Sequence, residues 1–183
     1  DAFVNNAANL GVGMSVLNST EADWDAVMNA NARAAFFGVQ ESVKLMKEGG
    51  SVVFISSCHA AKSVPARALY TISKAALGGM VRSLAVELGC LGIRANAILA
   101  GAVRTDRWDS LTDEQVQERR DRYPAGKESS PEEIAAAVAF LCSDAAKTIT
   151  GAEIPVDSGI GVCLLRYNKD WIANDPYNVK YWE

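Results

Sequence analysis

The sequence feature that most restricts the fold is an uncharged run of six residues, Ser51-Val52-Val53-Phe54-Ile55-Ser56. Its apolar and β-branched side chains follow one another without alternating with polar ones. This pattern is typical of a strand that is covered by other elements on both faces, as in a parallel sheet flanked by helices. The run therefore favours an α/β fold.

Amphipathic segments of helical length separate this run from three other strand-like runs. Thr20, Thr112 and Ser130 each precede such a segment, and their hydroxyl side chains are of the kind that caps helix N-termini. The alternation of strands and helices indicates a parallel sheet whose right-handed crossovers place helices on both faces. We expect strands at about residues 1–4, 51–56, 93–99 and 153–156, and helices at about 20–47, 69–88, 112–122 and 130–142.

Composition excludes several classes of protein. The 183 residues correspond to one ordinary domain, and their net charge of −4 gives no general attraction to nucleic acid phosphates. No apolar run approaches the roughly 20 residues of a membrane-spanning helix. The single histidine, His59, excludes a multi-histidine metal site, and four scattered cysteines without a C-x-x-C pair favour reduced thiols in a cytosol. We expect a cytoplasmic protein without a metal, nucleic acid or membrane partner.

Tyr70 and Lys74 are the first candidates for chemistry, because residues four apart near the start of a helix share one face. An ammonium near a phenol lowers the phenol's pKa from about 10, which favours proton exchange with a carbonyl or alcohol. Ser57 ends the predicted strand 51–56, at the edge where open α/β sheets bind ligands. Alone, Tyr-x-x-x-Lys is weak evidence, since a solvated lysine beside a packed tyrosine has the same spacing.

Five ordered motifs together resemble those of the short-chain dehydrogenase/reductase family. Asn5-Asn6-Ala7-Ala8 is similar to that family's Asn-Asn-Ala-Gly, and Gly101 to Thr105 resembles its Pro-Gly-x-x-x-Thr loop. The others are the segment that ends at Asn31, the strand end Ile55-Ser56-Ser57, and Tyr70 to Lys74. The resemblance covers residues 1–160. It implies a Rossmann-like, doubly wound parallel sheet and NAD or NADP as the cofactor.

The resemblance also assigns roles within the site. Tyr70 would be the general acid or base, Ser57 would bind the substrate oxygen, and Asn31 would hold a water that links Lys74 to solvent. Lys74 would lower the pKa of Tyr70 and bind the nicotinamide ribose. The family's other cofactor contacts correspond to Asn6, Ala7, Val103 and Thr105.

The family's glycine-rich pyrophosphate loop has no counterpart in this sequence. That loop, the first three strands and the residue that distinguishes NAD from NADP would all precede Asp1. We therefore expect residues 1–160 to be the C-terminal two-thirds of an NAD(P)-binding domain, truncated at the N-terminus and with weak or no cofactor affinity. Ala8 and Ala100 also replace a usual glycine and proline.

Residues 161–183 are expected to form an aromatic-rich C-terminal extension. The segment 164–183 holds five of the nine tryptophans and tyrosines of the chain. Three interpretations stay open for it: packing on its own surface, docking on a neighbouring subunit, or covering the substrate. The resemblance implies a homodimer or homotetramer, and Gly78-Gly79 would allow close packing against a second copy.

The sequence thus predicts an NAD(P)-dependent interconversion of a small-molecule carbonyl and a secondary alcohol. The Tyr-x-x-x-Lys spacing argues against the family's enoyl reductases, which as a class have a longer separation. His59 could touch the substrate or be an ordinary loop residue, and Arg104 and Arg107 could meet an anionic group or be solvated. The alternative functions are an inactive fragment and a non-catalytic member that acts through protein binding.

Overall fold

The computed structural model describes residues 1–46 and 49–163. Four parallel strands form one sheet in the order β1-β2-β3-β4. The register pairs Gly50 with Ile93 and Ser57 with Ala100, so β2 and β3 end at the same edge. The predicted parallel α/β fold is confirmed. The strands are β1 (Ala2–Asn5), β2 (Gly50–Ser57), β3 (Ile93–Ala100) and β4 (Glu153–Val156).

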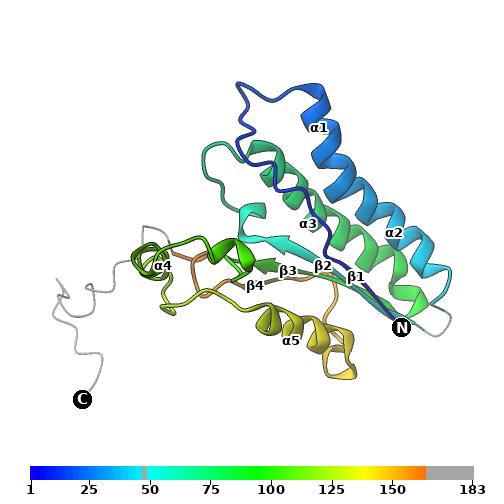
Figure 1. Cartoon of the computed structure of the whole chain (residues 1–183). Helices are drawn as coiled ribbons and strands as arrows, with labels where there is room; N and C mark the ends of the chain where they lie inside the picture. Colours follow the sequence, from blue (N-terminus) through cyan, green and yellow to red (C-terminus); the bar gives the residue numbers. More distant parts are fainter. Residues whose placement is uncertain (47–48, 164–183) are drawn as a thin grey trace, which may run out of the picture.

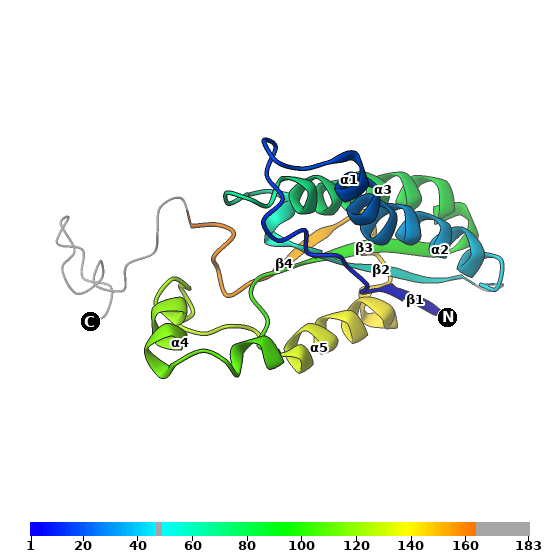
Figure 2. The same ribbon diagram turned by 45° about the horizontal axis from the view of Figure 1, so that its top comes forward.

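Helices cover both faces of the sheet, as Figures 1 and 2 show. Three of them, α1 (Glu21–Met28), α2 (Ala34–Val43) and α3 (Ala68–Leu88), lie on one face. On the opposite face lies α5 (Pro131–Cys142), while α4 (Asp113–Arg120) lies beyond the carboxyl ends of the strands.

The core is divided into two layers by the sheet. Val52 and Phe54 of β2 pack with Leu77 of α3, whereas Val53 packs with Leu141 of α5 on the other face. All five side chains are at most 1% exposed. Since successive side chains of a strand point to opposite faces, a strand buried on both must be apolar throughout. This explains the uncharged run.

The predicted helix starts are confirmed. The hydroxyls of Thr20, Thr112 and Ser130 each accept a hydrogen bond from the backbone N–H three residues later, and the side chain of that residue bonds back. Such capping boxes satisfy backbone donors that the helix itself leaves free, and one cap contributes about 1 kcal/mol. These local signals fix where three helices begin.

The continuous helix expected over residues 20–47 is wrong in two respects. A π-helical turn, Asn29–Arg33, separates α1 from α2, and α2 ends at Val43. Residues 47 and 48 lie outside the described part of the chain. A π-turn inserts an extra residue into the helix and is frequent at functional sites. Asn31 lies in this turn and is fully buried.

Gly78 lies against an acidic side chain of β4. A Cβ atom at this position would lie 2.5 Å from the carboxylate oxygens of Glu153 on β4. The same carboxylate accepts a hydrogen bond from Arg82 at 2.7 Å, one turn further along α3. Gly79 has no atom within 4 Å of its Cβ position. The contact gives Gly78 a packing role within the chain, and the expected packing of Gly78-Gly79 against a second copy stays a prediction.

The extension predicted for residues 161–183 lies outside the described residues from position 164 onward. Its three interpretations stay predictions. Within the described residues, none of the helices is long and apolar enough to cross a membrane.

Candidate active site

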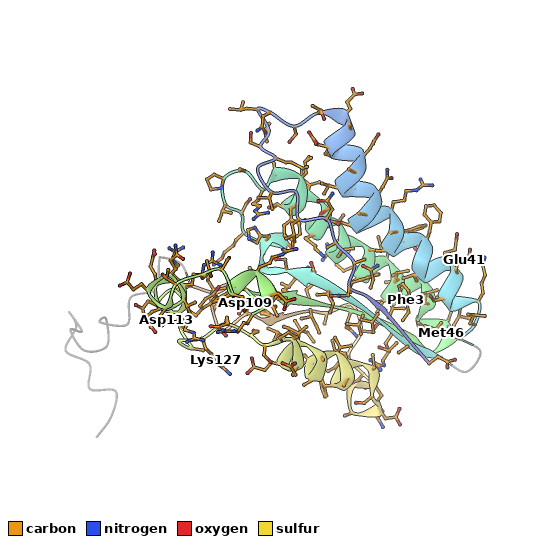
Figure 3. All side chains as sticks on the ribbon, viewed as in Figure 1. Phe3, Glu41, Met46, Asp109, Asp113 and Lys127 are labelled. Atoms are coloured by element: carbon orange, nitrogen blue, oxygen red, sulfur yellow. The ribbon has the colours of Figure 1, made fainter. Side chains whose placement is uncertain are left out.

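The carboxyl ends of β2 and β3 open into a cavity of about 590 Å³. Figure 3 shows the segment around α4, labelled at Asp109 and Asp113, at this end of the sheet and far from Met46 at the other. Six predicted site residues line the cavity: Ser57, Tyr70, Lys74, Asn6, Val103 and Thr105. Two do not line it. Asn31 is buried behind it, and Ala7 is exposed, whereas Ala8 contributes to the wall.

Ser57 and Tyr70 come from two elements that meet at this edge. Ser57 is the last residue of β2, and its hydroxyl accepts the backbone N–H of His59 at 3.2 Å, which starts a short 3₁₀ turn over Cys58–Ala60. Tyr70 lies in the first turn of α3. Hydrogen bonding with the Ser57 side chain lowers the pKa of Tyr70. Hydroxyl and phenol are therefore next to each other.

Burial nevertheless raises the pKa of Tyr70 above its ordinary value, and it outweighs the lowering effects of Ser57 and of the Arg67 charge. Lys74 is not among the groups that shift the pKa of Tyr70 here, and its predicted lowering effect stays a prediction. The Lys74 ammonium lies 5.7 Å from the centre of the tyrosine ring and donates to the carbonyl oxygen of Ile55 at 2.7 Å. A phenol in a poorly solvated site keeps its proton, because the phenolate loses hydration there.

Lys74 is held between the helix and the strand that carries Ser57. The residue is 2% exposed, and burial lowers the pKa of its ammonium to about 8. The Ser56 hydroxyl in turn donates to the backbone carbonyl of Lys74 at 3.2 Å. Two hydrogen bonds thus join α3 to the end of β2 at this residue. A lysine with a pKa near 8 carries its charge at neutral pH and loses it in mild base.

Asn31 binds backbone and side chain of two other segments. Its Oδ1 accepts the N–H of Asn9 at 2.6 Å, and its Nδ2 donates to the carbonyl oxygen of Asn9 and to the Ser73 hydroxyl, both at 2.8 Å. The amide therefore fastens the loop after β1 to the residue next to Lys74. The predicted role in holding a water is not tested by these contacts.

Arg67 is a cavity residue that the sequence did not single out. Its Nη1 donates to the carbonyl oxygen of Leu10 at 2.9 Å, and its backbone forms a parallel bridge with Met14. It therefore joins the loop after β1 to the start of α3, three residues before Tyr70. The feature of the sequence that could have indicated Arg67 as a site residue was its position three residues before Tyr70.

His59 lies against Tyr70. The two rings pack edge to face with their centres 5.7 Å apart, and His59 lines the cavity. Burial and the Arg67 charge lower the pKa of the imidazole, which is therefore neutral at pH 7. Its Nδ1 atom is buried and has no hydrogen-bond partner among the described residues.

Glu128 lies outside the cavity lining and binds two arginines. Its buried carboxylate accepts two hydrogen bonds from Arg120, both at 2.8 Å, and lies 3.5 Å from Nη1 of Arg104. The Arg120 hydrogen bond is the main cause that lowers the pKa of Glu128 to about 2. Arg104, considered above as a contact for an anion or as a solvated residue, is an ion-pair partner of Glu128.

Comparison with known proteins gives consistent relatives. A family model described as Enoyl-(Acyl carrier protein) reductase matches residues 1–161. L-rhamnose 1-dehydrogenase (NAD(P)(+)) of Azotobacter vinelandii is 36% identical over 169 residues, which are 90% of this chain and 66% of that protein. The 3-oxoacyl-[acyl-carrier-protein] reductase of Thermotoga maritima is 35% identical over 164 residues, covering 87% of this chain and 65% of its own length.

Solved structures agree with these relatives. Acetoin dehydrogenase from Enterobacter cloacae superposes with a TM-score of 0.82 at 32% identity, covering 92% of this chain and 67% of its own. An oxidoreductase of the short chain dehydrogenase/reductase family from Burkholderia thailandensis gives 0.80 at 31% identity, covering 87% and 64%.

The fold, the clustered site and these similarities show that the chain belongs to the short-chain dehydrogenase/reductase family. The chain spans between 58% and 66% of the length of the curated relatives it matches.

Proposed function

We propose that this chain carries the catalytic part of an NAD(P)-dependent oxidoreductase that interconverts a carbonyl and a secondary alcohol. The observation that carries the proposal is the meeting of Ser57, Tyr70 and Lys74 in one cavity at the carboxyl edge of the sheet. Ligands bind at this edge in open α/β folds. The name of one relative includes NAD(P)(+), which supports the cofactor class.

The residues of the cavity fit the nicotinamide end of such a cofactor. Lys74 offers an ammonium for ribose hydroxyls, and Val103 and Thr105 supply an apolar and a hydroxyl-bearing wall beside Asn6. A bound nicotinamide supplies or accepts the hydride. Ala7 lies outside the cavity, so its predicted contact with the adenosine part stays a prediction.

The proposed mechanism assigns the proton to Tyr70. In reduction, the phenol gives its proton to the carbonyl oxygen, while the Ser57 hydroxyl hydrogen-bonds to the same oxygen and stabilises its developing negative charge. The raised pKa keeps Tyr70 protonated at neutral pH, which is the form that reduction needs. Lys74 keeps a positive charge 5.7 Å from the centre of the tyrosine ring. Asn31 acts as a positioning residue for the loop after β1.

Carbonyl chemistry is preferred over reduction of a carbon–carbon double bond, which the description of the matching family model names. Tyr70 and Lys74 are one helical turn apart, and the hydroxyl of Ser57 is adjacent to the phenol. This arrangement offers two hydrogen-bonding groups to one substrate oxygen. Oxidation of reduced cofactor by 3-oxoacyl thioesters but not by 2-enoyl thioesters is the expected outcome; the reverse preference contradicts it.

The direct test is the effect of Tyr70→Phe on turnover and on cofactor binding in a longer form of the protein that includes a glycine-rich cofactor loop. Turnover, followed by the absorbance of reduced nicotinamide, should fall at least about 100-fold, since general acid–base catalysis contributes this much. The dissociation constant of NADH, from isothermal titration, should stay within about threefold. Retained turnover removes Tyr70 from the proton-transfer role.

An inactive fragment is the second candidate function. It is favoured by β1, which lies at one edge of the sheet and exposes 42% of Val4. An exposed apolar edge strand invites pairing with another chain. Titration of residues 1–183 with NADH and NADPH separates the two candidates: micromolar binding overturns the expected weak affinity.

A homodimer or homotetramer is also part of the proposal. Phe36 and Phe37 of α2 are 48% and 44% exposed and pack edge to face on the helix surface. Exposed aromatic pairs are common at interfaces. Light scattering coupled to size exclusion should report two or four copies, and Phe36→Ser should lower that number.

All four cysteines are free, which is compatible with the proposed cytoplasmic location.

A further inference from the structure

The ionisable groups that line the cavity are all basic or neutral. Among the described residues, its lining includes Arg67, Lys74, Arg107, Arg119 and His59, and neither an aspartate nor a glutamate. The whole chain, in contrast, has a net charge of −4. A concave, partly desolvated site of one sign concentrates ligands of the opposite sign. The charge of the cavity is thus opposite to that of the chain.

The contacts of the cavity arginines within the described residues are with a backbone carbonyl and an aromatic ring, and not with carboxylates. Within the described residues, the Arg67 guanidinium makes one hydrogen bond, to a backbone carbonyl, and Arg119 only stacks on the ring of Trp108. The Arg107 side chain has no hydrogen bond or ion pair in that part of the chain. Arginine presents several N–H donors in a planar fork that matches a carboxylate or phosphate.

Two carboxylates of this region are bonded to groups other than the cavity arginines. Glu128 forms ion pairs with Arg104 and Arg120, neither of which lines the cavity. Asp157, the acidic residue that affects Cys58, has its two oxygens bonded to the N–H groups of Gly159 and Gly161. Glu128 and Asp157 therefore have their own partners, and neither is paired with an arginine that lines the cavity.

Arg67 is also the arginine whose charge reaches the reacting group. It lies three residues before Tyr70 on the chain and influences the ionisation of both Tyr70 and His59. The buried and unpartnered Nδ1 of His59 adds a polar atom beside it. Because Arg67, Ser57 and Tyr70 line one cavity, an anion bound by Arg67 would share that cavity with a carbonyl held by Ser57 and Tyr70.

We propose, resting on the proposed function, that the substrate is a carbonyl compound or alcohol with a negatively charged substituent, such as a carboxylate. Arg67 binds this substituent in the cavity that also holds Ser57 and Tyr70, and Arg107 and Arg119, from the segment after β3, line the same cavity. Cofactor phosphates are the second possible source of such an anion. The experiment must therefore separate substrate from cofactor.

The test uses a matched pair of probes, 3-oxobutanoate and its methyl ester, which share the carbonyl and differ by one charge. Binding to residues 1–183 is measured by ligand-observed NMR titration at neutral pH and low salt, without cofactor. Wild type should bind 3-oxobutanoate about tenfold more tightly than the ester, as charge-assisted hydrogen bonds contribute this much. The preference should shrink in added salt, because exposed charges are screened.

Two variants and one control show which arginines cause the preference for 3-oxobutanoate over its ester. Arg67→Gln should reduce the ratio of the two affinities at least about threefold. The double variant Arg107→Gln, Arg119→Gln should reduce this ratio further. The double variant loses no described hydrogen bond, so it tests the proposal even where Arg67→Gln, which loses the bond to Leu10, unfolds. Arg82→Gln removes one positive charge from the surface end of α3 and should leave the preference unchanged.

Equal binding of the two probes to wild type overturns the proposal, as does a preference that survives in both variants. Arg67→Gln could also weaken the binding of NADH as much as it weakens the binding of 3-oxobutanoate. That result would assign Arg67 to the cofactor and would also overturn the proposal. Because no hydride transfer is needed, the titration is independent of turnover. Reduction of the ester alone would keep the proposed function and contradict only the anion site.

Discussion

The ammonium of Lys74 donates to the carbonyl oxygen of Ile55 at 2.7 Å, so the buried cation of α3 is bound to the strand that ends in Ser57. This hydrogen bond and that of the Ser56 hydroxyl to the Lys74 carbonyl join the helix with the phenol to the strand with the hydroxyl. The first of these bonds also fixes where the positive charge lies relative to the tyrosine ring. The chemistry of the site depends on this junction of helix and strand.

Tyr70 and Tyr123 form a matched pair for testing proton transfer. Both line the cavity, and burial raises the pKa of each. Tyr70→Phe is expected to lower turnover at least about 100-fold, whereas Tyr123→Phe should stay within about threefold, because only Tyr70 adjoins Ser57. Steady-state rates of both variants across pH check this. Comparable losses in the two variants would falsify the assignment.

Lys74→Met should weaken cofactor binding and rate while leaving the fold at least as stable at pH 7. The folded-state pKa of about 8 lies below the ordinary 10.5, so burial of the charged form costs stability at neutral pH. Methionine has a similar shape and no charge. Thermal unfolding and turnover are the measurements, with Lys44→Met on the surface as control. Unchanged binding and rate contradict the dual role.

The same lysine predicts a pH dependence with a defined sign. Between about pH 8 and 10.5 the unfolded chain binds more protons at this residue than the folded chain, so the lysine's contribution to the free energy of unfolding rises with pH. Turnover that needs the ammonium should instead fall as pH passes about 8. Urea unfolding of wild type minus Lys74→Met isolates the lysine, and a difference that falls with pH over this range contradicts the prediction.

Glu128→Gln should destabilise the protein by about 2 kcal/mol, because it weakens charge-assisted hydrogen bonds to Arg120 in a buried position. The folded-state pKa of about 2 lies below the ordinary 4.5, so the stabilisation is complete above pH 4.5 and is lost as pH falls toward 2. Glu41→Gln, which removes an exposed pair with Lys44, should cost less than about 0.5 kcal/mol. Urea unfolding at neutral and at acid pH measures the loss of stability in each variant. If Glu128→Gln lowers the free energy of unfolding equally at both pH values, the stabilising role of the ionised Glu128 is refuted.

Asn31→Asp separates positioning from catalysis. Aspartate keeps an acceptor for the N–H of Asn9 but removes the donor to the Asn9 carbonyl and to Ser73. A buried, partly unsatisfied site of this kind costs about 1–3 kcal/mol. Hydrogen exchange should show faster opening at residues 9–14 than in wild type. Unaltered exchange there, together with lowered turnover, points to a direct catalytic role.

Much of the fold was predictable because its signals are local. The uncharged run 51–56 and the capping residues Thr20, Thr112 and Ser130 determine their elements through neighbours a few residues away. The site residues Ser57, Tyr70 and Lys74 were found through spacing and family resemblance. Parallel strands with equal ends then bring their loops to one edge.

The contacts and properties that the sequence did not predict all depend on residues far apart in the chain. Asn31 bonds residues 22 and 42 positions away, and these bonds accompany a π-turn that helical periodicity does not contain. Arg67 bonds a carbonyl 57 positions away. The raised pKa of Tyr70 follows from burial, which only the assembled fold produces. Sequence spacing placed Lys74 on the same face as Tyr70, yet the strand carbonyl of Ile55 determines where its ammonium lies.

Gly78 lies two turns along α3 from Tyr70, where Glu153 approaches the helix backbone. An added methyl at this point would meet the Glu153 carboxylate, which would have to move and disturb its hydrogen bond with Arg82. Gly78→Ala should therefore weaken the contact between α3 and β4, and Gly79→Ala, one residue on and in open space, should not. The lack of a side chain at position 78 thus leaves room for an acidic group of the edge strand directly against the helix backbone.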